Sequence, residues 1–236
     1  EFRRVLSDLY STMYNLMMTK QISGKSSRKS LKGQAQENRE LALNEIKRNL
    51  ILAAAKEAFL ELGLDGASLR EIAKRSGYTP GAIYSYFSSR EEIYAVMLSD
   101  SLEKLRQEVA KVGTSPAKKT KAALHQLLAE QAMAFFMFYY NHPQDMDLGF
   151  YLFNGAQPKG LTPELNQKLN AALRLTLNPV ENTLIALGFS KAQAVRKTTA
   201  IFGHAVGLLI LHNTGRIRIF KQDAKELFKD YLKELV

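Results

Sequence analysis

The chain has 236 residues, of which 46% are hydrophobic and 24% are charged. This length fits one or two compact domains, and the composition excludes a wholly disordered chain. The formal net charge of +10 indicates an anionic partner, of which nucleic acid is the commonest, although a generally basic protein without such a partner has the same composition. Residues 41–97 have no net charge, so charge alone does not locate a binding site.

Several classes of site are excluded by the residues that are missing. Without any cysteine, there is no disulfide scaffold, thiolate zinc site, iron–sulfur cluster or cysteine nucleophile. No run of about 18 uncharged apolar residues occurs, so we expect no membrane-spanning helix, and an interrupted N-terminal apolar run argues against a secretory signal. The motifs of serine hydrolases, zinc peptidases, P-loops and dinucleotide sites are absent. We therefore expect a cytoplasmic protein that is not an enzyme and has no cofactor or metal.

Residues 1–43 are predicted to be an N-terminal extension, with an amphipathic helix over 1–20 and a mobile basic linker over 21–40. The linker is rich in Ser, Gly, Lys and Arg and has little to bury. Two interpretations stay open: a dispensable extension or misplaced start, and a helix that docks on a partner or membrane while the linker touches DNA phosphate. The helix prediction rests on apolar residues at helical spacing, namely Phe2, Val5, Leu6, Leu9, Met13, Leu16 and Met17.

Residues 44–97 are predicted to form four helices close together. The first runs over 44–62, where apolar residues recur every three or four positions, and Gly63 ends it. The second begins at Ser68, which forms a capping box with Glu71. The third is short, with Thr79 as N-cap and Pro80 at its first position. Ser88 or Ser89 caps the fourth.

The second and third of these helices form the pattern of a helix-turn-helix. Gly77 suits the left-handed bend of the turn, and the second helix of such a pair can enter a DNA major groove. An internal helical corner has the same spacing and stays the alternative. Buried residues that would lock the two helices together are Ile72, Ala73, Ile83 and Phe87. Residues expected to face outward are Thr79, Gly81, Ala82, Ser85 and Tyr86.

The stretch 48–97 resembles the DNA-binding domain of the TetR/AcrR family of transcriptional regulators. The resemblance covers about fifty residues, and the rest of the C-terminal part is similar to the family only in length and helical layout. It is carried by Arg48, Ile51, Leu52, Ala54, Ala55, Phe59, Gly63, Ile72, Ala73, Gly77, Gly81, Tyr84, Phe87, Arg90 and Glu91.

This resemblance implies a homodimer that binds a roughly palindromic double-stranded DNA operator through two such domains. Pro80 and Ala82 depart from the family pattern, because they replace residues that can hydrogen-bond. Recognition of the DNA sequence is therefore expected to depend on methyl contact, on Tyr86 and on DNA shape. The expected DNA-binding residues are Lys47, Arg48, Ser68, Arg70, Thr79, Pro80, Gly81, Ala82, Tyr84, Ser85, Tyr86 and Arg90. We also expect one basic side made by Arg48, Arg70, Lys74, Arg75 and Arg90, with Glu57, Glu61 and Asp65 away from it.

Residues 93–236 are predicted to be an effector-binding and dimerisation domain of long helices separated by polar breaks, which include residues 141–147 and 213–222. A dense aromatic and methionine cluster over 122–153 suits an apolar small-molecule pocket, although ordinary core packing explains it equally. The resemblance implies that an effector bound there changes the spacing of the two DNA heads. Candidate ligand-binding residues are Phe135, Phe136, Tyr139, Tyr140, Tyr151 and His204.

The last two long helices are predicted to form the dimer interface. Residues 198–213 are nearly all apolar, and 223–236 carry one apolar stripe. The resemblance implies a four-helix bundle between two subunits, and intramolecular core is the alternative. Candidate interface residues are Gly203, Gly207, Leu208, Leu227 and Tyr231.

The sequence thus predicts an all-α protein of about nine helices plus an extra N-terminal one. The helix-turn-helix domain spans 44–92, and a larger helical ligand-binding and dimerisation domain follows over 93–236. The function that fits is a ligand-responsive transcriptional regulator, most simply a repressor released from a palindromic operator by a small apolar or amphipathic effector. A helical protein-interaction adaptor with a non-functional helix-turn-helix is the alternative. Neither the operator nor the effector can be deduced, and a membrane partner is not expected.

Overall fold

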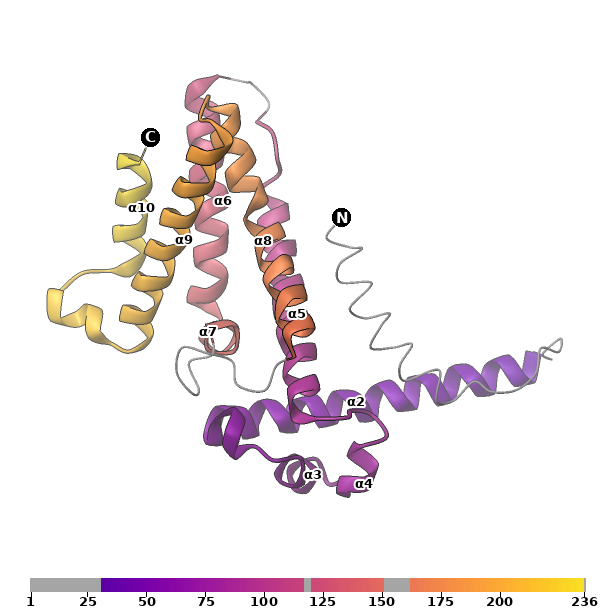
Figure 1. The fold of residues 1–236 in the computed structure, drawn as a ribbon. Helices are drawn as coiled ribbons and strands as arrows, with labels where there is room; N and C mark the ends of the chain where they lie inside the picture. Colours follow the sequence, from indigo (N-terminus) through magenta and orange to yellow (C-terminus); the bar gives the residue numbers. More distant parts are fainter. Residues whose placement is uncertain (1–30, 117–119, 151–161, 236) are drawn as a thin grey trace. The chain divides into compact units, whose positions relative to one another are not determined.

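The computed structural model describes residues 31–116, 120–150 and 162–235. Within these ranges the chain forms nine α-helices and one 3-10 helix and no strand (Figure 1). The prediction of an all-α fold is therefore confirmed. The helix expected over residues 1–20, the first half of the expected linker and Tyr151 lie outside the described residues.

The chain divides into two compact units. The first comprises the residues up to Ser99 together with Phe150–Leu169, and the second comprises Asp100–Gly149 and Asn170–Val236. The predicted helix-turn-helix lies in the first unit, and the predicted dimerisation helices lie in the second.

Helix α2 (Leu31–Gly66) is much longer than the helix expected over 44–62. Residues 31–40 were assigned to a mobile linker, and this prediction was wrong. The physical reason is that residues 31–40 include Leu, Lys, Gln, Ala, Glu and Arg, which are good helix formers. The first buried residue of α2 is nevertheless Ile51, so packing begins where the family-like segment begins. Gly63 breaks the helical geometry with φ 68° and ψ 173°, close to the predicted end.

Helices α3 (Leu69–Ser76) and α4 (Pro80–Ile83) follow, each with a capped N-terminus. The Oγ of Ser68 accepts a hydrogen bond from the Glu71 backbone N–H at 3.2 Å, so the predicted N-cap is confirmed. The reciprocal half of the predicted capping box is not formed with this glutamate. Its carboxylate instead accepts from Arg75 at 2.8 Å, one turn further along the helix.

Helix α5 (Arg90–Lys111) begins after Ser89, whose Oγ accepts from the Glu92 N–H at 3.1 Å. The second unit contains α6 (Lys121–Asn141), α7 (Pro143–Phe150), α9 (Lys191–Asn213), the 3-10 helix η1 (Arg216–Phe220) and α10 (Ala224–Glu234). Helix α8 spans Pro163–Ala186.

Two of the predicted breaks differ in the structure. The break expected over 141–147 is shorter, because α7 starts at Pro143, which suits a first helical position, and Asp145 sits in the first turn. The break expected over 213–222 contains η1.

The core of the second unit is built around α6, which packs against α9 and α10. Helices α6, α9 and α10 run side by side in Figure 1. Phe136 of α6 stacks on Phe228 of α10 with ring centroids 4.7 Å apart, and Phe135 meets Phe202 of α9 edge to face at 5.6 Å. Within the described residues 122–150, the aromatic cluster thus contributes Phe135, Phe136, Phe138 and Tyr139 to a packed core.

A buried glutamine connects three segments of this unit. The side-chain N–H of Gln131 donates to the carbonyl of Gly113 at 3.0 Å, and its side-chain oxygen accepts from the Thr183 hydroxyl at 2.9 Å. Because both ends of the amide are satisfied, this polar residue can be fully buried without the cost of an unmade hydrogen bond.

Candidate nucleic-acid interface

The turn between α3 and α4 has the geometry of a helix-turn-helix. Gly77 adopts φ 74° and ψ 15°, the left-handed conformation that glycine reaches without strain. The backbone N–H of Tyr78 donates to the Ala73 carbonyl at 2.9 Å, which closes the end of α3. Thr79 then caps α4, because its Oγ accepts from the Ala82 N–H at 3.2 Å, and Pro80 follows at the first helical position. The left-handed glycine at the end of α3 and the N-cap of α4 were both predicted.

Four apolar residues fix this turn to the rest of its unit. Each is at most 1% exposed, so the prediction that they lock the two helices is confirmed; they are Ile72, Ala73, Ile83 and Phe87. Because these residues make the packing contacts, the opposite side of α4 is not needed for packing within the unit. The alternative of an internal helical corner is wrong, since a corner inside a core would have both sides of α4 buried.

The outward side of α4 is accessible. Thr79, Pro80, Gly81 and Ser85 are exposed, and Ala82 is half-buried. These side chains are small, so DNA can approach the backbone of α4 closely. No charge is carried by this side, and direct base contacts from it are limited to a hydroxyl, a methyl and backbone groups.

The two tyrosines after α4 differ from each other. Tyr84 is 58% exposed and is free to contact DNA. Tyr86 is half-buried, and its hydroxyl donates to the side-chain oxygen of Asn44 on α2 at 3.3 Å. Sequence reasoning missed Asn44, because the contact joins positions 42 residues apart and no local pattern marks it. Tyr86 is thus oriented by α2 and is less free than we expected.

Basic side chains flank this side, but they are not equally available. Lys47, Arg70 and Lys74 are exposed. Arg48 is half-buried, with its guanidinium carbon 5.5 Å from the centre of the Phe87 ring. Arg90 pairs with Glu91 at 2.7 Å. Ser68 is exposed but uses its Oγ as the α3 cap.

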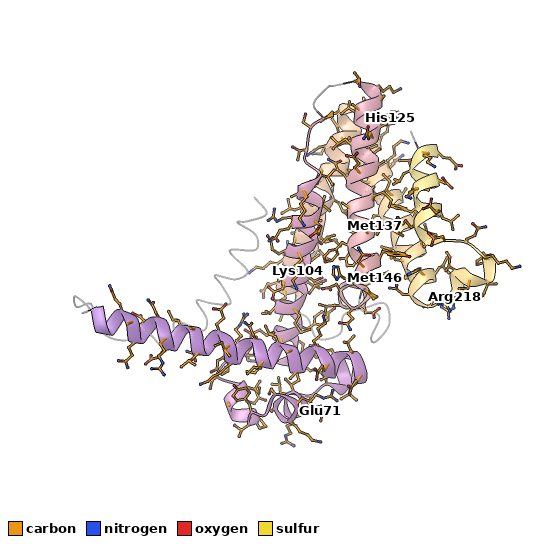
Figure 2. All side chains as sticks on the ribbon, turned by 180° about the vertical axis from the view of Figure 1, so that it is seen from behind. Glu71, Lys104, His125, Met137, Met146 and Arg218 are labelled. Atoms are coloured by element: carbon orange, nitrogen blue, oxygen red, sulfur yellow. The ribbon has the colours of Figure 1, made fainter. Side chains whose placement is uncertain are left out.

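Arg75 corrects our expectation about charge separation. Its guanidinium contacts Glu61 at 2.8 Å and Glu71 at 2.8 Å, and these hydrogen bonds raise its own pKa further above the usual value. The Arg75 guanidinium in turn holds the pKa of Glu61 below its usual range. Arg75 therefore ties α3 to α2, and Glu61 is not kept away from the basic residues. Figure 2 labels Glu71 on this helix.

The predicted ligand-binding residues lie mostly in the core of the second unit. Phe135, Phe136 and Tyr139 are at most 3% exposed, and Tyr140 is half-buried and stacks on His212 at 4.3 Å. Burial raises the pKa of the Tyr139 hydroxyl above its usual range.

His204 is separate from these residues, because it is exposed on α9 and stacks on Tyr231 at 4.0 Å. Partial desolvation of its ring lowers the pKa of His204. The ring of Phe228 stacks on both His204 and Phe136 and so lies between them.

The predicted interface residues lie on two neighbouring helices. Gly203 and Gly207 are exposed on α9, Leu227 and Tyr231 are half-buried on α10, and Leu208 is 7% exposed. By length and composition alone α9 meets the criterion for a helix that could cross a membrane, although it contains no run of 18 uncharged apolar residues. Only 33% of its most apolar 18-residue window is buried within the protomer. A helix buried between two chains meets the same criterion.

Comparison with known proteins places this arrangement in a class of helix-turn-helix DNA-binding proteins. The family described as "Bacterial regulatory proteins, tetR family" matches residues 51–97. The chain is 31% identical to "Uncharacterized HTH-type transcriptional regulator YdgC" of Bacillus subtilis over 137 residues, which cover 56% of this chain and 67% of that protein. The chain belongs to the TetR family of bacterial regulatory proteins.

Other relatives match a smaller share of their length. "HTH-type transcriptional activator FasR" of Mycolicibacterium smegmatis is 32% identical over 104 residues, 44% of this chain and 45% of that protein. The chain thus spans less than half the length of this relative. A solved structure, "Crystal structure of putative regulatory protein SCO4313", is similar with a TM-score of 0.67 at 21% identity, over 83% of this chain and 97% of that one. That likeness shows the fold.

Proposed function

We propose that this protein is a transcriptional regulator that binds a roughly palindromic DNA operator as a homodimer. The observation that carries the proposal is the open outer side of residues 79–86 beside a fully locked helix-turn-helix. Two such sides, related by a twofold axis, would meet half-sites about one helical turn of DNA apart or somewhat more. Lys47, Arg70 and Lys74 supply exposed positive charge for phosphates at the rim.

The homodimer is part of the proposal. Gly203 and Gly207 are exposed on α9, and Leu227 and Tyr231 are half-buried on α10. The two glycines, which have no side chain, would allow close approach of another helix. Two copies that pack α9 and α10 together would form a four-helix bundle, which buries this surface and sets the distance between the DNA heads.

The effector is proposed to be a small apolar or amphipathic molecule bound in the second unit. Support comes from the aromatic content of α6 and from the similar fold of a regulator of fatty acid degradation. A fatty acid degradation regulator FadR from Bacillus halodurans has a TM-score of 0.58 at 18% identity, over 80% of this chain and 94% of that one. Binding of such a molecule to the DNA-incompetent arrangement would weaken operator binding by the difference in affinity for the two arrangements.

The first experiment tests DNA binding itself. DNA bound by the full chain is selected from a random pool, and the selected fragment is titrated by fluorescence anisotropy at several salt concentrations. We expect a palindromic fragment and an affinity that falls with salt. Tyr84→Ala with Arg90→Ala should abolish specific binding, whereas the control Lys104→Gln, at an exposed position on α5, should bind as the wild type does.

The outcomes separate the proposal from its rival. Failure to enrich any DNA would contradict the regulator and favour a helical adaptor with a non-functional helix-turn-helix. If a fragment is enriched, fatty acids and acyl thioesters are then tested for its release. Release by none of them would leave DNA binding intact and count against the effector class.

A further inference from the structure

The turn between α9 and α10 carries the two most exposed large apolar side chains among the described residues. In η1, Ile219 is 76% exposed and Phe220 is 63% exposed. Three exposed basic residues flank them, namely Arg216, Arg218 and Lys221. Figure 2 shows Arg218 pointing away from the helices that the turn connects. Adjacent exposed apolar side chains of this size commonly mark an interaction surface.

The turn has a defined backbone conformation. Ile217 is only 6% exposed and anchors η1, which packs back on α9. Backbone hydrogen bonds run from Arg218 N–H to the Gly215 carbonyl at 3.2 Å and from Lys221 N–H to the Arg218 carbonyl at 3.1 Å.

Lys221 ends the turn at φ 51°, and within the described ranges it is the one non-glycine residue with a positive φ. A lysine in this conformation costs free energy, so the surrounding structure holds it there.

We propose that this turn is a cross-subunit clamp, in which Ile219 and Phe220 of each protomer pack against the second copy of the chain. The inference rests on the homodimer proposed above and adds to it. Its first support is continuity, because η1 directly joins α9 and α10, the two helices of the proposed bundle, and packs on α9. Its second support is symmetry, since a twofold axis buries this pair of side chains twice.

The distribution of charge also favours a second copy of the chain as the partner of this turn. The exposed side of α10 alternates Lys with Glu226, Asp230 and Glu234, so a second copy offers carboxylates to the arginines of the turn. Two of these carboxylates already pair weakly with lysines of their own helix at 2.7 and 2.8 Å, and such exposed pairs exchange partners at little cost. The apolar pair would then be surrounded by a charged rim, as in other protein interfaces.

The chain contains no tryptophan, which makes Phe220→Trp a clean single reporter in the full-length protein. We expect its emission to be blue-shifted and protected from iodide when the protein is concentrated, and to shift to the red on dilution below the dimer dissociation constant. The control is Tyr84→Trp, at a 58% exposed position in the first unit, with emission that should not depend on concentration in the absence of DNA.

The second measurement is the dimer dissociation constant from sedimentation equilibrium. Ile219→Ser with Phe220→Ser should weaken the dimer at least tenfold, because apolar anchors at the centre of an interface carry most of its affinity. Ile185→Ser, at a 41% exposed apolar position on α8, should leave the constant within twofold.

Each outcome has a distinct meaning. A wild type that stays monomeric at every concentration would overturn the homodimer and the clamp together. The clamp alone would be overturned if Phe220→Trp dimerises but its indole emits like free tryptophan, or if the double serine variant dimerises normally. A blue shift that occurs only with anionic phospholipid vesicles would overturn it in favour of a lipid surface.

Discussion

The helix-turn-helix and the α9–η1–α10 region differ in how far their apolar side chains are buried. In the first, the apolar side chains that lock α3 and α4 are buried, and the outer side presents small or polar groups together with Tyr84. In the second, Ile219, Phe220 and the open side of α9 leave apolar surface uncovered. A single protomer therefore completes the core of its helix-turn-helix, whereas its last helices leave apolar surface uncovered, which the proposed homodimer would bury.

The largest effect is expected in the core between α6 and α10, which a single protomer forms by itself. Phe228→Ala removes a fully buried ring that stacks on Phe136, and we expect a loss of about 3–5 kcal/mol in the free energy of unfolding. Urea denaturation followed by circular dichroism measures it. Lys233→Ala, with a side chain that is 74% exposed, should change stability by less than about 0.5 kcal/mol. Equal effects of the two variants would mean that α10 is not packed on α6.

The next effect tests the backbone of the DNA head. An added Cβ at Gly77 would meet no atom within 4 Å, so the cost of Gly77→Ala comes from its positive φ alone. We expect about 1–2 kcal/mol of destabilisation, measured by thermal unfolding. Gly77→Asn should cost less, since asparagine tolerates this conformation. If alanine were as stable as glycine here, the turn geometry would be incorrect.

The sharpest contrast between the two regions comes from the glycines of α9. Alanine at Gly203 or Gly207 meets no atom within 4 Å in the protomer and should stabilise the helix by about 0.5–1 kcal/mol at each position. In the dimer the added methyl groups would hold the helices apart. We expect the double alanine variant to have a higher thermal midpoint when dilute and a weaker dimer by sedimentation. A tighter dimer would show that this side of α9 is not the interface.

The smallest effect concerns the ion pair between α3 and α2. Because Arg75 lowers the pKa of Glu61, the pair stabilises the first unit above pH 4.5 and loses its effect as the pH falls through the lowered value. Glu61→Gln should remove this dependence, with a change in thermal midpoint of less than about 2 °C at neutral pH. Melting curves between about pH 6 and about pH 3 measure it, with Glu57→Gln as the control. An unaltered pH profile in Glu61→Gln would contradict the contact.

The helix-turn-helix could be predicted from the sequence because its determinants are local. The caps at Ser68 and Thr79, the glycine of the turn and the buried residues after it each act within a few positions. The partners of Arg75 and Tyr86 could not be predicted in this way. Their contacts to Glu61 and Asn44 join positions 14 and 42 residues apart, and they depend on how α2 crosses the domain.

The C-terminal region was predicted less well for a related reason. Its apolar content indicated helices and a core, but the same content describes a pocket, a dimer surface and a membrane span. Only packing separates these alternatives. It places Phe135 and Phe136 in the core, whereas Gly203 and Ile219 remain exposed. The short turn at 216–220 carries no helical period and was interpreted as a polar break, so its exposed apolar pair escaped notice.

The cap of α4 has a consequence for the chemistry that Thr79 can offer. The Ala82 amide occupies one of the two lone pairs of its hydroxyl oxygen, so the acceptor capacity of the hydroxyl is halved while its hydrogen remains available as a donor. A DNA group that meets this hydroxyl is therefore expected more often to be an acceptor, such as a phosphate oxygen, guanine O6 or N7, adenine N7 or thymine O4, than the amino group of cytosine. The residue that caps α4 can in this way contribute to base preference.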